Sequence, residues 1–139
     1  MKLELIGFTP HLEEVVATAI LTTTRRSRPS RIFRSLLEDT ERVRGLIEGL
    51  SLQHRSVLEH NRVNYLLEAS GEEVLEILLW SKFFDVTRLG EGLWLVSTNL
   101  KEIVRAVLER GPMWRELLRS MEVFAPNLFH RLEGVLHEC

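Results

Sequence analysis

Residues 86–97 have the sequence VTRLGEGLWLVS, and this segment decides the fold class. Gly90-Glu91-Gly92 is a turn signal, and the stretches on either side of it carry β-branched and aromatic residues that strands favour. Two such stretches joined by a short glycine-containing connection are typical of a β-hairpin. The segment therefore places antiparallel strands in the fold.

Two further strands are expected outside this hairpin, and a helix precedes it. Residues 2–8 alternate polar and apolar side chains at first, and residues 61–69 alternate in part. Ser70 is followed three residues later by Glu73, which is the spacing of a capping box. We therefore expect a helix over residues 71–84, with an apolar character that suits the core or an interface.

Helical spacing of apolar residues predicts most of the remaining chain. Thr9 is expected to cap the first of these helices and Pro10 to occupy its first position, and a loop rich in Thr, Arg, Ser and Pro follows it. Gly111-Pro112 is a stop signal between two later helices. The expected helices cover residues 10–23, 30–50, 99–109, 113–124 and 126–137. The sequence thus predicts an α+β protein in which helices dominate.

The composition is that of one ordinary globular domain covering residues 1–139, with 45% hydrophobic and 27% charged residues. The single cysteine is Cys139, so no disulfide within the chain is expected. The apolar runs are far shorter than the ~20 residues that span a bilayer. We therefore expect a soluble, cytoplasmic protein with no membrane partner.

The basic residues are unevenly distributed along the chain. The net charge is −2 and the pI about 6.2, yet Arg25, Arg26, Arg28, Arg31 and Arg34 lie close together with no acid among them. Guanidinium groups suit phosphates and carboxylates. The cluster is interpreted either as a phosphate-binding loop or as a solvated basic turn, and its ligand stays unassigned. Nucleic acid is the weaker hypothesis, because Phe33 is the one aromatic residue in the stretch available for stacking on bases.

The segment around residue 56 contains residue types found in metal centres and in serine-nucleophile sites. His54 and His60 are six residues apart, which does not place both on one face of a helix, and Ser56, Glu59 and His60 lack a nucleophile elbow. Structural histidines are the preferred interpretation. No metal site and no catalytic residue is assigned.

Two blocks of the sequence resemble the flavin-dependent thymidylate synthase family. Residues 53–65 resemble the family's Gly-His-x-Ser/Thr-x-x-Glu-His element and the alternating strand after it, with Gln53 in place of the glycine. Residues 99–110 resemble its Asn-x-Arg-Ser/Glu-Leu helix, which closes with Leu-Arg, although Lys101 replaces the first arginine. The family's Arg-His-Arg signature is missing, so the chain looks like a shortened, divergent member.

The resemblance implies a fold, a cofactor and an assembly. The family has a twisted, mostly antiparallel sheet flanked by helices, and it forms tetramers with FAD bound between subunits. Carried over by position, it implies a nucleotide contact at Arg110 and flavin contacts at Ser56, Glu59, Asn99, Lys101 and Arg105. The family's reaction converts dUMP to dTMP with a methylene group from methylenetetrahydrofolate and a hydride from reduced flavin.

Three functional hypotheses follow. In the first, the chain is a thymidylate synthase-like flavoprotein that binds FAD and a pyrimidine deoxynucleotide as a homo-oligomer; the missing signature leaves its catalysis open. In the second, it is a non-catalytic oligomeric binding or scaffold module of the same fold. In the third, the arginines of residues 25–34 bind nucleic acid.

Overall fold

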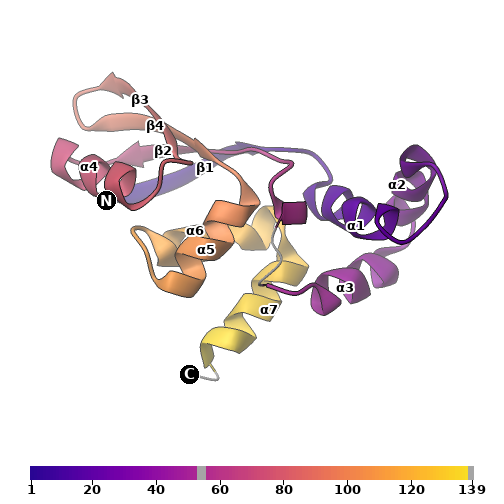
Figure 1. Cartoon of the computed structure of the whole chain (residues 1–139). Coiled ribbons are helices and arrows are strands. Elements are labelled where there is room, and N and C mark those ends of the chain that lie inside the picture. Colours follow the sequence, from indigo (N-terminus) through magenta and orange to yellow (C-terminus); the bar gives the residue numbers. More distant parts are fainter. Residues whose placement is uncertain (53–55, 138–139) are drawn as a thin grey trace. The chain divides into compact units, whose positions relative to one another are not determined.

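The computed structural model describes residues 1–52 and 56–137 (Figure 1). Within these residues the fold is α+β, with one four-stranded antiparallel sheet and seven α-helices. The chain packs as two compact units. The sheet unit consists of residues 1–9 and 61–120, and the helical unit of residues 10–60 and the chain from residue 121 onward.

The sheet has the strand order β1-β2-β4-β3. The predicted hairpin is confirmed, and the two flanking strands lie where the alternation of side chains placed them. The order puts β1 and β3 at the edges and β2 and β4 in the middle. The strands are β1 (Lys2–Phe8), β2 (Val63–Glu68), β3 (Asp85–Gly90) and β4 (Leu93–Thr98).

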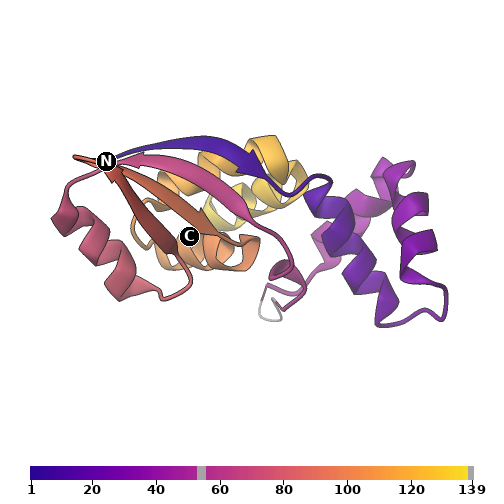
Figure 2. The same cartoon turned by 90° about the horizontal axis from the view of Figure 1, so that it is seen from above.

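One face of the sheet carries the core of its unit. On β2 the side chains of Val63, Tyr65 and Leu67 are fully buried, whereas the residues between them are partly exposed. Helices α5 (Leu100–Glu109) and α6 (Trp114–Phe124) follow the sheet, and Figure 2 shows α5 behind it while no helix covers the face toward the viewer. The sheet unit is therefore built as a sheet with helices on one side.

A partly buried hydroxyl pair joins the inner strand β2 to α6. The oxygen atoms of Tyr65 and Ser120 are 2.7 Å apart, and the Ser120 hydroxyl also donates to the carbonyl of Leu117 at 2.7 Å. Because the serine proton is used there, Tyr65 is the donor to Ser120. Burial raises the pKa of Tyr65, so the phenol stays protonated and keeps donating.

Helix α4 (Gly71–Trp80) begins as predicted and ends earlier than predicted. Ser70 and Glu73 form the capping box, each side chain bonding the backbone N–H of the other. The expected end at residue 84 is wrong. Ser81 leaves the helix in extended conformation because its hydroxyl donates to the carboxylate of Glu102 at 2.6 Å. Phe84 then lies in the core, outside the helix.

The helical unit contains α1 (Leu12–Thr22), α2 (Pro29–Leu37), α3 (Thr40–Gly49) and α7 (Pro126–His137). The single helix predicted over residues 30–50 is wrong, because α2 and α3 are separate. Asp39 caps α3 by accepting a hydrogen bond from the backbone N–H of Arg42 at 3.1 Å. An N-cap residue has a non-helical backbone, so this cap interrupts the helical pattern.

The expected start of the first helix at Pro10 is also wrong. Thr9 caps no helix; it pairs with Arg62 instead, donating its N–H to the Arg62 carbonyl and accepting the Arg62 N–H at its hydroxyl oxygen, each at 2.9 Å. Helix α1 begins at Leu12, after His11 in left-handed backbone conformation with φ 53°. The long-range pairing thus takes precedence over the local capping signal.

Helix α7 is capped by a carboxylate from α1. Glu13 is 5% exposed, and its oxygens accept the backbone N–H groups of Asn127 (3.3 Å) and Leu128 (3.0 Å) and the side-chain amide of Asn127 (3.1 Å). These donors lie in the first turn of α7, where a negative charge is favourable. Burial nevertheless raises the pKa of Glu13 above its ordinary value of 4.5.

The indole of Trp80 packs against Gly111, just after α5. A Cβ atom at residue 111 would lie 2.6 Å from Cε2 of Trp80, which is closer than real Cβ contacts come. The position thus needs a residue without a side chain. None of the helices in the described part of the chain is long and apolar enough to cross a membrane.

Replacing Gly111 by alanine is expected to destabilise the protein by about 1–3 kcal/mol, because Trp80 must move out of its packed position. Gly134 is the matched control, since it lies within α7 and a Cβ there meets nothing within 4 Å. Gly134→Ala should raise stability by up to about 1 kcal/mol. Urea unfolding of both variants measures this, and equal effects would contradict the close packing at Gly111.

Replacing Glu13 by glutamine is expected to change how stability depends on pH. Since the pKa of Glu13 is raised in the folded state, folded wild type binds more protons than unfolded wild type at pH values just above 4.5. Wild type should therefore lose stability relative to Glu13→Gln as pH rises through that interval. Urea unfolding from pH 4 to pH 7 tests this, with Glu14→Gln as control. A difference independent of pH would contradict it.

Candidate anion-binding site

A small basic pocket lies in the helical unit. Its volume is about 180 Å³. Three arginines, two serines and three aliphatic residues line it, and no acidic residue is among them. The lining residues are Leu21, Arg25, Ser27, Arg31, Ile32, Ser35, Leu36 and Arg42. The basic pocket is defined by these eight residues.

The end of α1 positions Arg25. The hydroxyls of Thr22, Thr23 and Thr24 donate back to carbonyls three residues earlier, at 2.7–3.3 Å. The N–H of Arg25 donates to the carbonyl of Leu21 at 3.0 Å. Bonds of this kind satisfy the last carbonyls of a helix, so the first residue after the threonine run is held at the end of α1.

Helices α2 and α3 supply the other two arginines. Arg31 and Ser35 are four residues apart on α2 and therefore share one face of the helix. Arg42 lies in the first turn of α3, and the cap at Asp39 fixes where that turn begins. Leu21, Ile32 and Leu36 are at least 90% buried, so the aliphatic part of the lining belongs to the packed core.

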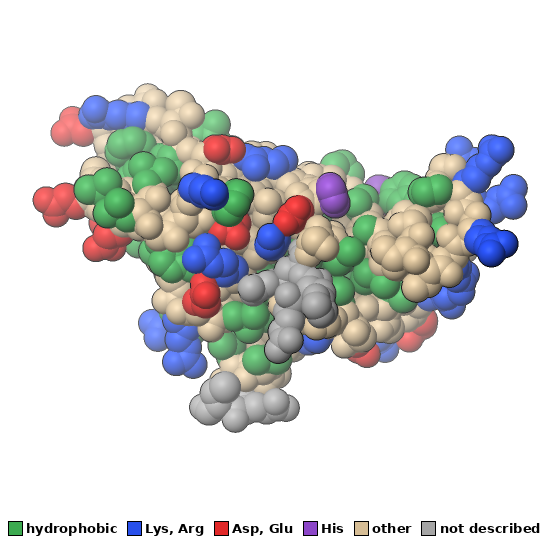
Figure 3. Space-filling model, in the orientation of Figure 1, with side chains coloured by type: hydrophobic (Ala, Val, Ile, Leu, Met, Phe, Trp, Pro, Cys, Tyr) green, Lys and Arg blue, Asp and Glu red, His purple; other side chains and the backbone are tan. Residues whose placement is uncertain are grey.

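The charge of the basic pocket is uncompensated within residues 1–52 and 56–137. None of Arg25, Arg31 and Arg42 forms an ion pair with a described side chain, whereas Arg44 in the same unit pairs with Glu41 at 3.4 Å. Figure 3 shows basic side chains gathered over α2 and the loop before it, at the right of the view. All three side chains are exposed, so solvent screens part of their mutual repulsion.

The basic pocket is chemically suited to a tetrahedral oxyanion. Guanidinium groups donate in pairs to phosphate oxygens, and serine hydroxyls add neutral donors. The volume of the basic pocket is smaller than that of pockets that enclose a whole drug-sized ligand, which is about 300–1,000 Å³. It therefore fits one phosphate group, with the rest of any ligand outside.

The structure places the expected flavin and nucleotide residues in both units. Asn99, Lys101, Arg105 and Arg110 lie on α5 or at its ends, in the sheet unit. Ser56 begins a short 3₁₀ turn (Ser56–Leu58), and Glu59 follows it, in the helical unit. The side chain of Asn99 caps α5 by accepting the Glu102 N–H at 3.0 Å.

Arg105 is engaged in a network within the sheet unit. Its guanidinium pairs with Glu102 and with Glu109, each at 3.0 Å, and lies 4.3 Å from the centre of the Trp80 ring. Glu102 is 3% exposed, so it depends on this partner. The structural role of Arg105 is thus clear without a ligand.

Arg110 occupies a more open position. It is exposed and ends α5 in left-handed conformation with φ 52°. Its guanidinium lies 5.6 Å from the centre of the Trp114 ring, and that of Arg115 lies 5.0 Å from the same ring. A half-buried indole beside two guanidinium groups combines a stacking surface with positive charge.

The histidines show no metal centre in the part of the structure that is described. His54 lies outside the described residues, and His60 is exposed. Among the described side chains, no three His, Cys, Asp or Glu come together as metal ligands.

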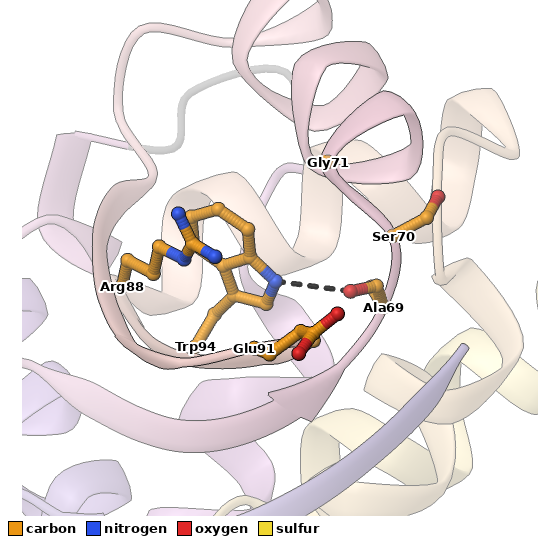
Figure 4. A pocket seen from close by; sticks show the side chains of 7 residues that line it. Ala69, Ser70, Gly71, Arg88, Glu91 and Trp94 are labelled. Atoms are coloured by element: carbon orange, nitrogen blue, oxygen red, sulfur yellow. Dashed lines mark hydrogen bonds between the residues drawn. The ribbon is translucent and has the colours of Figure 1, made fainter.

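A second, wider pocket of about 560 Å³ lies in the sheet unit beside the hairpin (Figure 4). Trp94 is fixed there by its indole N–H, which donates to the carbonyl of Ala69 at 3.0 Å, and Arg88 lies 6.0 Å from the ring centre. Glu91 lines the same pocket, so its charge is mixed. Arg88 and Trp94 are cross-strand partners, a pairing that the hairpin register alone could have indicated.

Sequence reasoning found two of the three arginines of the basic pocket and missed Arg42. A signal was available, because Asp39 three residues before Arg42 has the spacing of an N-cap and would have separated α2 from α3. Comparison of the chain with protein-family models, with curated protein sequences and with solved structures gave no match.

Proposed function

We propose that this chain is a binding protein for a phosphorylated small molecule whose phosphate group occupies the basic pocket. The observation that carries the proposal is the convergence of Arg25, Arg31 and Arg42 on one pocket without a lining carboxylate. A phosphate brings two negative charges and several acceptor oxygens to a place where all charged donors are positive. Binding therefore relieves the repulsion among the guanidinium groups.

The expected affinity is modest. Hydrogen bonds to charged groups contribute about 1.5–3 kcal/mol each, but the three arginines are exposed and lose side-chain freedom on binding. Phosphate alone is therefore expected to bind in the millimolar range. The organic part of a natural ligand would add contacts outside the pocket.

A small molecule is favoured over single-stranded nucleic acid by the surroundings of the pocket. Proteins that bind single strands combine basic grooves with aromatic rings on which bases stack. Phe33, the aromatic residue nearest in sequence to Arg31, is partly buried and makes an edge contact with His11, with ring centres 6.3 Å apart. Its ring is engaged within the fold, and a single phosphate group fits the small pocket better.

The family resemblance provides a second proposal, which the surroundings of Arg110 support. In this proposal the chain is a flavin-dependent thymidylate synthase-like protein that binds a pyrimidine deoxynucleotide at Arg110, where the Trp114 ring offers a surface for a base. The missing Arg-His-Arg signature favours binding without catalysis. The proposed FAD contacts are Ser56, Glu59, Asn99, Lys101 and Arg105.

Inorganic phosphate is expected to bind wild type and to raise its melting temperature as binding saturates. Arg31→Gln and Arg42→Gln should each weaken phosphate binding by about 10-fold, because each removes one charged donor. Arg34→Gln is the matched control, since Arg34 is an exposed arginine on the same helix outside the pocket lining. Calorimetric titration at constant ionic strength measures the three variants.

Equal loss in all three variants would contradict a defined pocket and indicate a diffuse basic surface. Titration with a single-stranded oligonucleotide provides the comparison for nucleic acid. Binding that is far tighter than that of phosphate and steeply salt-dependent would favour the nucleic-acid hypothesis.

The second proposal predicts that added FAD and dUMP bind independently of the basic pocket. Arg110→Gln should weaken dUMP binding by about 10-fold, and phosphate binding should stay at the wild-type level. Arg115→Gln is the control, since the Arg115 guanidinium lies 5.0 Å from the centre of the same Trp114 ring and no nucleotide contact is assigned to it. Equilibrium dialysis and the visible flavin spectrum measure both ligands. No FAD binding at high micromolar concentration would overturn the flavin assignment.

A further inference from the structure

The pocket beside the hairpin of β3 and β4 has the size of a small-molecule site. Its volume is about 560 Å³, and pockets that enclose small ligands have volumes of about 300–1,000 Å³. Its lining includes the side chains of Arg88, Glu91 and Trp94 and the backbone at Ala69 and Gly92 (Figure 4). We call this cavity the hairpin pocket.

Two hydrogen bonds to Ala69 hold the walls of the hairpin pocket in place. The N–H of Ala69 donates to the carbonyl of Gly92 at 3.0 Å, and the carbonyl of Ala69 accepts the indole N–H of Trp94 at 3.0 Å. Gly92 has φ 70°, the left-handed conformation that favours glycine. The turn and the indole are thus tied to the same residue. A ligand meets walls that are already ordered, so little side-chain freedom is lost there on binding.

The two charged side chains of the hairpin pocket are not neutralised by the fold. Neither Arg88 nor Glu91 forms an ion pair with a side chain in residues 1–52 and 56–137. The Nε atom of Arg88 donates to the carbonyl of Gly90 at 3.3 Å, which holds the guanidinium at the hairpin. The Ser70 hydroxyl also lines the pocket, but it is engaged in the capping box of α4. Both charges can therefore pair with a ligand.

These two charges lie on different sides of the indole. The Arg88 guanidinium is 6.0 Å from the centre of the Trp94 ring. Figure 4 shows it beside the six-membered ring, whereas the Glu91 carboxylate lies on the other side of the indole, toward Ala69. An indole offers a large apolar surface for a ligand. A molecule on this surface meets a positive group at one end and a negative group at the other.

We propose that the hairpin pocket binds an α-amino acid with an apolar side chain, in its zwitterionic form. The carboxylate of the ligand pairs with Arg88, its ammonium group pairs with Glu91, and its side chain lies against Trp94. A ligand that is only anionic is repelled by Glu91, and one that is only cationic is repelled by Arg88. The proposal is independent of the phosphate ligand, because the basic pocket belongs to the other unit.

L-phenylalanine and two analogues that each lack one charge test the proposal. N-acetyl-L-phenylalanine has no ammonium group, and L-phenylalanine amide has no carboxylate. Phenylalanine should bind wild type in the millimolar range, and each analogue about 5- to 10-fold more weakly, because one ion pair is lost. An NMR titration that follows the indole N–H signals measures this. Trp94 should shift, and the signals of Trp80 and Trp114 serve as internal controls.

Charge-neutral variants assign each end of the ligand. Glu91→Gln should weaken phenylalanine binding about 5- to 10-fold and abolish the preference over N-acetyl-L-phenylalanine, because the ammonium group then has no charged partner. Arg88→Gln should likewise abolish the preference over the amide. The matched controls are Glu68→Gln and Arg119→Gln, since both side chains are exposed and lie outside the pocket lining. Both controls should bind all three compounds as wild type does.

Circular dichroism establishes that the variants are folded, as expected for exposed side chains. No shift of the Trp94 signal at tens of millimolar phenylalanine would overturn the proposal. So would equal binding of the three compounds by wild type, or shifts confined to Trp80 and Trp114. Variants at residues 88 and 91 that behave like the two controls would remove the assigned charge pairing. Loss of phosphate binding at the basic pocket has no bearing on any of these results.

Discussion

The buried carboxylate of Glu102 is the constraint on which the sheet unit depends. It is 3% exposed, and such a group must have partners because an unpaired buried charge is very costly. Ser81 donates to it at 2.6 Å and Arg105 pairs with it at 3.0 Å. The bond from Ser81 ends α4, and the pairing holds the Arg105 guanidinium over the ring of Trp80. The length of α4, and hence the side chains on its outer side, follows from this one requirement.

The need to compensate charge also divides the arginines of the chain into two kinds. Arg105 has its charge compensated by Glu102 and Glu109, so its position is explained by the fold. Arg25, Arg31 and Arg42 have no ion pair among the described residues, and the fold gains no stability from bringing them together. The phosphate group that we propose for the basic pocket would compensate these charges. The resemblance to the flavin-dependent family predicts a flavin contact at Arg105, whereas the unpaired arginines of the described residues support a phosphate site at the basic pocket.

The elements predicted correctly are those whose local signal has no competing partner from elsewhere in the chain. The hairpin around residues 90–92 and the capping box at Ser70 are short-range patterns, and both are confirmed. The predicted end of α4 and the predicted cap at Thr9 were wrong, because Glu102 and Arg62 compete for those residues from distant positions in the sequence. A pattern read along the chain contains no information about such partners. Arg42 was missed for a different reason, because the local capping signal at Asp39, which separates α2 from α3, was not recognised.

The net charge of −2 gives no indication of the basic pocket. Several acidic side chains near it in the sequence instead cap a helix or form ion pairs. Asp39 directs its carboxylate to the start of α3, and Glu41 and Glu48 both lie within 4 Å of Arg44. These contacts keep acids that are close in sequence away from the pocket. A chain with slightly more acidic than basic residues can thus hold a concentrated positive site, provided that helix capping and i,i+3 or i,i+4 pairing engage the nearby carboxylates. The spatial assignment of each charge, rather than their sum, determines which anion the surface can bind.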